Sequence, residues 1–119
     1  MATMQVEVVS AEKRLFSGEA TEVYARSLDG EIGILPGHQP ALLALDIAPV
    51  KIKLVDGTIQ RVAIHQGFLY FQNNHLVVLA DIAELPEQID RAAVEDMTVD
   101  GDDDSAAAKW RAVQLDVAS

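Results

Sequence analysis

Residues 30–45 constrain this chain more than any other part of its sequence. They read GEIGILPGHQPALLAL, with three glycines and two prolines among aliphatic residues. The segment cannot be a helix, because Pro36 lacks an amide donor and clashes with the preceding turn. Pro36 and Gly37 fit the central positions of a type II turn, where glycine supplies the positive φ. The sequence therefore predicts a rigid, apolar loop that leads into a buried strand and presents a contact surface.

Short apolar runs separated by turn signals fill residues 1–83 and indicate a β domain. The clearest hairpin joins residues 50–55, which alternate apolar and charged, to residues 58–64. Its Asp56-Gly57 pair favours a type I′ turn, in which both central residues have positive φ. A second hairpin joins residues 68–72 to 75–79 through two asparagines. This spacing is typical of a β-sandwich or barrel.

The pattern changes after Leu85, and residues 85–119 indicate a short helical hairpin behind a β domain at residues 1–84. Pro86 fits the first position of a helix. An acidic break at residues 98–104 then separates two apolar stripes at helical spacing. The stripes are Ile89, Ala92, Ala93 and Met97, and then Ala106, Trp110, Val113 and Val117. Short helices need a tertiary partner, so either Trp110 docks on the β domain or the hairpin frays.

The charge of the chain is negative and unevenly distributed. The net charge is −10, and residues 84–119 contribute −7 of it, from three basic and ten acidic side chains. Such a surface argues against nucleic acid and against direct binding to anionic lipid. No apolar run approaches the ~18–20 residues that span a bilayer. We therefore expect other proteins to hold the chain at any membrane where it works.

Catalytic and metal-binding motifs are missing from the sequence. The three histidines lie in separate segments, without the i, i+4 spacing of zinc proteases. There is no nucleophile elbow and no Walker loop. The absence of cysteine excludes disulfides and thiolate sites, and the acidic run at residues 102–104 lacks the spacing of a calcium loop. We expect no catalytic residue, no metal and no cofactor.

Four blocks of sequence together resemble one known family. The blocks are residues 8–12 with 16–18, residues 30–38, Gly67-Phe68-Leu69, and Leu79-Ala80-Asp81. In this order they resemble the epsilon subunit of bacterial F-type ATP synthase, called delta in mitochondria. The resemblance covers nearly the whole chain and implies a flattened N-terminal sandwich of about ten strands.

The resemblance also implies a function. Family members are non-catalytic subunits of the central stalk, which link the gamma subunit to the membrane c-ring and couple proton flow to ATP synthesis. The chain is then expected at the cytoplasmic face of the bacterial cell membrane, as a peripheral subunit held by its partners. Two other classes stay open: an ATP-sensing regulatory module, and an unrelated small β-sandwich adaptor or an enzyme with an unrecognised site.

The family's rotor-facing loop corresponds to residues 30–40 of this chain. The resemblance places Glu31 toward the c-ring and His38 near gamma, although the ring of His38 could instead fix the loop through a backbone hydrogen bond. Ile32, Ile34 and Leu35 offer more binding energy than these polar residues, because burying a large aliphatic side chain is worth about 1.5–3 kcal/mol and an exposed ion pair about 0–1 kcal/mol. Alternation puts Ile32 and Ile34 on one face, either in the core or toward the partner.

The C-terminal hairpin departs from the family pattern at two points. Members that bind ATP carry Ile/Leu-Asp-x-x-Arg-Ala, but here the arginine position holds Ala93, and Arg91 lies roughly 200° around the helix from it. We therefore do not expect nucleotide binding, for which Asp90 and Arg91 are the candidate residues. In many members a longer basic helix reaches the catalytic beta subunits and blocks ATP hydrolysis. The acidic hairpin here predicts at most weak regulation through such a contact.

Overall fold

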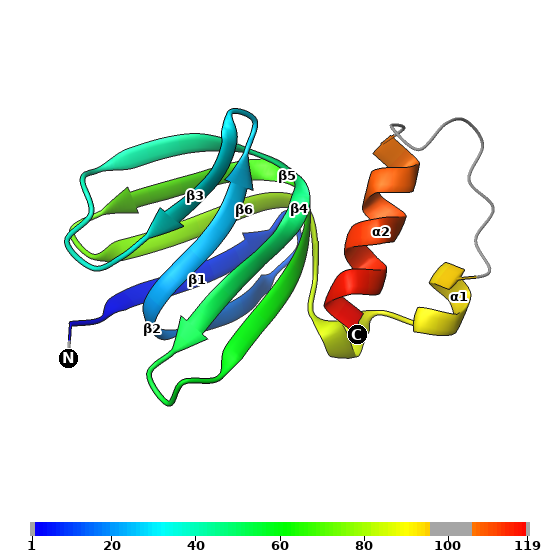
Figure 1. Ribbon diagram of the computed structural model, residues 1–119, viewed down its shortest axis with the longest axis horizontal. Helices are drawn as coiled ribbons and strands as arrows, with labels where there is room; N and C mark the ends of the chain where they lie inside the picture. The colour runs from blue at the N-terminus through cyan, green and yellow to red at the C-terminus, as the bar shows by residue number, and fades with distance from the viewer. Residues whose placement is uncertain (1, 96–105, 119) are drawn as a thin grey trace.

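The computed structural model describes residues 2–95 and 106–118, which form a β domain with a helical part beside it (Figure 1). No helix within these ranges is long and apolar enough to cross a bilayer. The strands are β1 (Met4–Ser10), β2 (Arg14–Ser27), β3 (Gly30–Ile34), β4 (Ala41–Leu54), β5 (Ile59–Gln72) and β6 (His75–Glu84). The helical segments are the 3-10 turn η1 (Pro86–Gln88) and the helices α1 (Arg91–Glu95) and α2 (Ala106–Ala118).

The strands form a flattened and closed β-sandwich. They are hydrogen-bonded in the order β1-β6-β5-β4-β2-β3, and a further pairing of β1 with β2 closes the sheet. The pairing of β1 with β6 is parallel, and the other pairings are antiparallel. The prediction of a mainly β N-terminal part followed by a helical part is confirmed.

The expected count of about ten strands is wrong, because the described residues form six. Three of the six, β2, β4 and β5, are each 14 residues long. The two halves of β2 pair with different neighbours: residues 14–20 with β1 and residues 23–27 with β3. In β5 the ladder runs through an irregularity at Gln66 and Gly67, where φ is 62° and 150°. The register of β2 with β4 also shifts between Ala20 and Glu22 and between Tyr24 and Ser27. Such shifts let one long strand change neighbours without ending, so the fold needs fewer separate strands.

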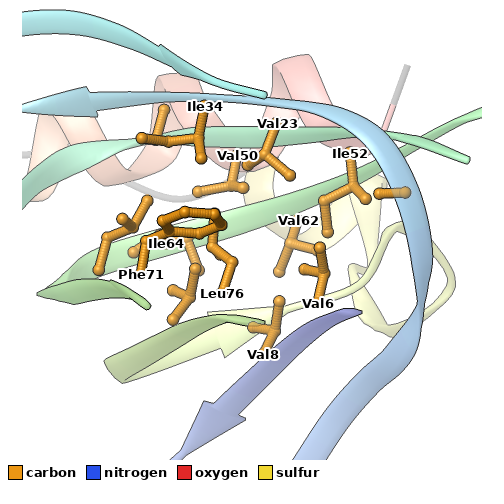
Figure 2. Packing of buried hydrophobic residues seen from close by; sticks show 14 of the residues in the cluster. Val6, Val8, Val23, Ile34, Val50, Ile52, Val62, Ile64, Phe71 and Leu76 are labelled. Atoms are coloured by element: carbon orange, nitrogen blue, oxygen red, sulfur yellow. The ribbon is translucent and has the colours of Figure 1, made fainter. Parts of the chain in front are cut away.

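The main core lies between the two layers of the sandwich. Figure 2 shows Ile34 beside Val23 and Val50, with Phe71 beneath them. The alternation predicted for residues 50–54 is present, since Val50 and Ile52 are buried and the lysines between and after them are exposed. Aliphatic residues from every strand of the sandwich make up this core.

Both predicted hairpins are present, but the turn of the first differs from expectation. The type I′ prediction for Asp56-Gly57 is wrong, because of these two residues only Gly57 has positive φ, at 91°. The Gly57 amide donates to the Leu54 carbonyl oxygen at 2.9 Å, which makes a three-residue loop that ends in a glycine bulge. Asn73 and Asn74, with φ of 54° and 57°, have the two positive φ values of a type I′ turn.

The first predicted apolar stripe of the helical part is only partly right. Pro86 starts a 3-10 turn, and Ile89 after it is extended, with φ −93° and ψ 120°. The helix α1 begins only at Arg91, because the Asp90 carboxylate accepts a hydrogen bond from the Ala93 amide at 3.1 Å and so caps its first turn. Ile89 is buried, but Ala92 and Ala93 are exposed. Met97 and the break at residues 98–104 lie outside the described residues.

The second stripe, on α2, packs against the outer surface of β4 and β5. Val113 and Val117 are buried against Ile47 and Ala63, while Ala106 is exposed, contrary to its predicted place in the stripe. The ring of Trp110 meets that of His65 with centroids 5.2 Å apart. Of the two alternatives for the hairpin, docking through Trp110 is therefore the one observed.

Candidate interaction surface

Some of the charged side chains form ion pairs at the surface, and none of those in the described ranges forms a metal site. Glu7 pairs with Arg14 at 3.2 Å and with His75 at 2.9 Å, which links β1, β2 and β6. No group of three or more histidine, aspartate or glutamate side chains in the described residues could hold a metal ion. The candidate binding surface is formed instead by exposed hydrophobic side chains.

Four large hydrophobic side chains are exposed side by side on β4, β5 and β6. Leu42, Phe68, Tyr70 and Leu79 expose 67%, 53%, 43% and 50% of their surface. Leu42 lies opposite Tyr70, and Phe68 lies opposite Leu79. Phe68 and Tyr70 are two residues apart on one strand, so all four side chains point to the same outer face. We call these four residues the apolar patch.

Smaller apolar residues extend the apolar patch on both sides. Ala44 lies opposite Phe68 on β4, and Val77 lies opposite Tyr70 on β6. Val9 of β1 lies opposite Leu79. All three are partly exposed. Contiguous exposed apolar surfaces are typical of sites where another molecule binds.

The backbone beside the apolar patch depends on Gly67. A Cβ atom added at this residue would lie 2.1 Å from the carbonyl oxygen of Leu79. The backbones of β5 and β6 therefore approach each other closely next to the Phe68–Leu79 pair, and only glycine permits both this approach and a φ of 150°. This close approach thus holds the part of β5 from which Phe68 and Tyr70 project against β6.

The loop predicted at residues 30–40 is only partly right, because residues 30–34 pair with β2 as the strand β3. The turn that follows, at residues 35–38, lies at the end of the β5–β6 hairpin. The predicted type II turn is present: the His38 amide donates to the Leu35 carbonyl oxygen at 3.0 Å, and Gly37 has a φ of 86°. The Gly37 amide donates to the side-chain oxygen of Asn74 at 2.7 Å. The ring of His38 lies edge-on to that of Phe71, with centroids 5.8 Å apart. The turn is therefore attached to the hairpin that carries the apolar patch.

The structure separates the three aliphatic residues proposed for the rotor contact. Ile34 has no exposed surface, so it belongs to the core and cannot touch a partner while the domain is folded. Ile32 is half-buried against the same core, as its alternation with Ile34 predicted. Leu35 is 49% exposed and, with Val55, lines a hollow on the other side of the turn. Of the three, Leu35 is the one freely available to a partner.

The two polar residues proposed for the rotor contact lie at the surface. Glu31 has 79% of its side chain exposed and pairs with Arg26 at 3.3 Å. His38 is half-buried, and its Nδ1 lies 2.6 Å from the Gln39 carbonyl oxygen. The contact of the His38 ring with the backbone, which is one of the two roles considered for it, is therefore present. A contact of His38 with a partner stays a prediction.

The candidate residues for nucleotide binding have roles within the helical part. Asp90 caps α1 through the Ala93 amide. The guanidinium of Arg91 pairs with Glu95 at 2.9 Å and donates to the Leu115 carbonyl oxygen at 3.4 Å. Our expectation that these residues bind no nucleotide stays a prediction.

Sequence reasoning missed the apolar patch, although a signal for it was present. In residues 68–71 all four side chains are large and apolar. Because strand residues alternate between faces, such a run is apolar on both faces. Leu69 and Phe71 fill the core, so Phe68 and Tyr70 had to face either a second layer or a partner.

Comparison with known proteins gives one consistent family. The sequence model described as the β-sandwich domain of the ATP synthase delta/epsilon chain matches residues 3–86. The chain is 47% identical over 94 residues to an ATP synthase epsilon chain of Streptomyces avermitilis, a match that covers 79% of this chain and 76% of the relative. With the epsilon chain of Streptomyces griseus subsp. griseus it shares 43% identity over 112 residues, covering 93% and 90%.

Solved structures of low sequence identity share the fold. A chain of the Euglena gracilis mitochondrial ATP synthase, from a structure of OSCP, F1 and c-ring, matches with a TM-score of 0.70 at 17% identity. The match covers 98% of this chain and 78% of that one. A chain of the central stalk and c-ring of the Tetrahymena thermophila mitochondrial enzyme matches with a TM-score of 0.62, also at 17% identity, and covers 96% and 92%.

Proposed function

This chain belongs to the ATP synthase delta/epsilon family, and from that premise we propose that it is a non-catalytic central-stalk subunit of a proton-translocating F-type ATP synthase. In this role it joins the gamma subunit to the c-ring and transmits proton-driven rotation to the catalytic heads. It acts as a peripheral subunit at the cytoplasmic face of a bacterial membrane. In this proposal residues 1–84 are the rotor-binding domain and residues 85–119 are the C-terminal helical part.

The apolar patch is the observation that carries this proposal. Its four large side chains project from hydrogen-bonded strands of a closed sandwich, so little conformational entropy is lost when a partner covers them. A stable joint buries about 1,200–2,000 Å² in total, which is more than a single turn provides. The apolar patch and the turn at residues 35–38 together offer a larger surface on a stiff support.

We assign the two kinds of surface to two kinds of partner. We assign the apolar patch to gamma, because an apolar surface on each partner gains by leaving water. Glu31, with its exposed carboxylate, suits the polar loops of the c-ring. Leu35 and His38, on the turn that follows β3 in sequence, complete the proposed interface. Ile34 is left out of this interface because it is buried in the core.

We propose only a weak regulatory role for the helical part. One of the two basic residues of α2, Arg111, donates to the carbonyl oxygens of Val94 and Glu95 at 3.1 and 3.0 Å. The guanidinium of Arg111 therefore stabilises the docked hairpin. It would have to break these two hydrogen bonds before it could contact the catalytic beta subunits. The net charge of −7 in residues 84–119 opposes an approach to acidic segments.

The proposal is tested by mixing the purified chain with the gamma subunit and measuring co-elution by size-exclusion chromatography. We expect a stable complex with the unmodified chain and loss of the complex with Phe68→Asp. The matched control is Ile59→Asp, because Ile59 is a 55% exposed aliphatic residue of β5 outside the apolar patch. Thermal denaturation of each variant shows whether its fold is intact.

Two outcomes would overturn the proposal. The first is a folded, unmodified chain that does not co-elute with gamma, which would favour an unrelated adaptor. The second is equal binding by the Phe68→Asp and Ile59→Asp variants, which would remove the apolar patch from the interface.

A further inference from the structure

Asn74 connects three segments of the chain that are far apart in sequence. Its side-chain oxygen accepts a hydrogen bond from the Gly37 amide at 2.7 Å. Its backbone carbonyl accepts one from the Gln5 amide of β1 at 2.9 Å. Its φ of 57° places it in the left-handed region, which asparagine tolerates better than most residues. One residue of the β5–β6 turn therefore touches both the turn at residues 35–38 and β1.

The bond between Asn74 and Gly37 determines where the turn lies. Within the described part of the chain, no other hydrogen bond joins residues 35–38 to the β5–β6 hairpin. A further contact between the two is the edge-on approach of the rings of His38 and Phe71. Without the side chain of Asn74, the turn would be held by that ring contact and by the strands on either side of it.

The turn and the apolar patch become one surface through this connection. Leu42, at the edge of the patch, follows the turn in sequence and lies opposite Tyr70. Tyr70 in turn is close to the β5–β6 turn, because Gln72 pairs with His75 across it. A partner that covers the patch therefore also meets the turn, provided that the turn is held in place. Holding it in the free protein lowers the entropy lost on binding.

We propose that Asn74 is a positioning residue for partner binding, whose side-chain amide holds the Pro36-Gly37 turn beside the apolar patch. This inference rests on the proposed function, since the partner is the gamma subunit. Asn74 itself need not touch gamma, because it acts through Gly37 and His38.

Three variants of the full chain test the inference. Asn74→Gly keeps the left-handed backbone but removes the acceptor. Asn73→Gly is the matched control, because Asn73 has a φ of 54° in the same turn and no side-chain hydrogen bond within the described residues. Asn74→Asp restores an acceptor oxygen at the same position and is the conservative rescue.

We expect Asn74→Gly to weaken gamma binding by roughly three- to tenfold, the scale of one hydrogen bond. Asn73→Gly and Asn74→Asp should bind as the unmodified chain does. Titration calorimetry with purified gamma gives the affinities, and thermal denaturation gives the stabilities. In NMR spectra of the free chain, the Gly37 amide proton should move upfield in Asn74→Gly and keep its position in Asn73→Gly.

The outcomes separate the inference from the proposed function. If the unmodified chain binds gamma and both glycine variants bind equally well, the positioning role is overturned and the stalk function stands. A loss of binding that merely follows a loss of thermal stability in both glycine variants would also overturn the positioning role. If the folded, unmodified chain does not bind gamma, the proposed function fails, and the positioning role fails with it.

Discussion

The indole ring of Trp110 in α2 meets the imidazole ring of His65 in β5 edge-on, with centroids 5.2 Å apart and an angle of 80° between the planes. A second contact supports the same docking, because Gln114 of α2 donates from Nε2 to Glu84 at 2.6 Å. Together with the buried Val113 and Val117, these contacts hold α2 against the sandwich. Figure 1 shows α2 standing alongside one end of the strands.

Replacing Trp110 by alanine should release α2 from the sandwich. Edge-to-face ring pairs contribute about 0.5–1.5 kcal/mol beyond burial, and a half-buried tryptophan adds the loss of its packing, so we expect a cost of about 1–3 kcal/mol. Trypsin should then cleave faster after Lys109 and Arg111. Leu28→Ala, at a 65% exposed position, is the control. An unchanged cleavage rate in Trp110→Ala would show that the ring contact does not hold the helix.

Gly67→Ala should destabilise the domain more than the same substitution at Gly30. The new Cβ at Gly67 would collide with the Leu79 carbonyl, and the φ of 150° adds strain. Gly30 is the matched control, because it also has positive φ, 129°, but a Cβ added there would meet no heavy atom within 4 Å. We expect Gly30→Ala to cost about 1–3 kcal/mol and Gly67→Ala at least about 2 kcal/mol more. Equal denaturation midpoints would contradict the close approach.

Ile34 and Leu35 should respond in opposite ways to alanine substitution. Ile34→Ala leaves a cavity in the core and should lower the free energy of unfolding by about 2–5 kcal/mol. Leu35→Ala, at a 49% exposed position, should change it by about 0.5 kcal/mol or less and should weaken rotor binding. Chemical denaturation and gamma binding measured on both variants check this. A large loss of stability in Leu35→Ala would place Leu35 in the domain's own packing.

The hydrogen bonds of Asp56 predict a small pH dependence of stability. The pKa of this carboxyl is held below its ordinary value of 3.8, first because the Thr58 hydroxyl donates to it and then because the Thr58 amide does. A pKa lower in the folded than in the unfolded state stabilises the fold above the unfolded value, and this stability is lost as the pH falls through the folded value. Asp56→Ala should therefore be less stable than the unmodified chain at neutral pH, and the difference should shrink below about pH 4. A difference that grows on acidification would reverse this assignment.

ATP should not stabilise this chain against heat. Asp90 and Arg91 are engaged within the helical part, through the cap of α1 and through Glu95. A ligand present at a hundredfold excess over its dissociation constant would add about 2.7 kcal/mol. Thermal denaturation with and without millimolar ATP measures this. A clear rise in the midpoint would bring back the alternative of an ATP-sensing module.

The sequence by itself determined the features that depend on neighbouring residues. The type II turn at Pro36-Gly37, the two hairpins and the alternation of residues 50–54 follow from local backbone preferences and side-chain period. The change from β to helical pattern near Leu85 is equally local. The family followed from four short blocks, one of which contains Gly67, where the close approach of β6 leaves no room for a side chain.

Only the tertiary structure decided the features that depend on segments far apart in the chain. Pairing of β5 with β4 and β6 brings Leu42, Phe68, Tyr70 and Leu79 onto one face. Packing of α2 covers Ile47 and Ala63 and leaves the apolar patch open. The burial of Ile34 but not Leu35, the close approach of β5 to β6 at Gly67 and the bond between Asn74 and Gly37 arise in the same way. Each depends on strand register and layer packing, which no short stretch of sequence specifies, because they are set by the free energy of the whole domain.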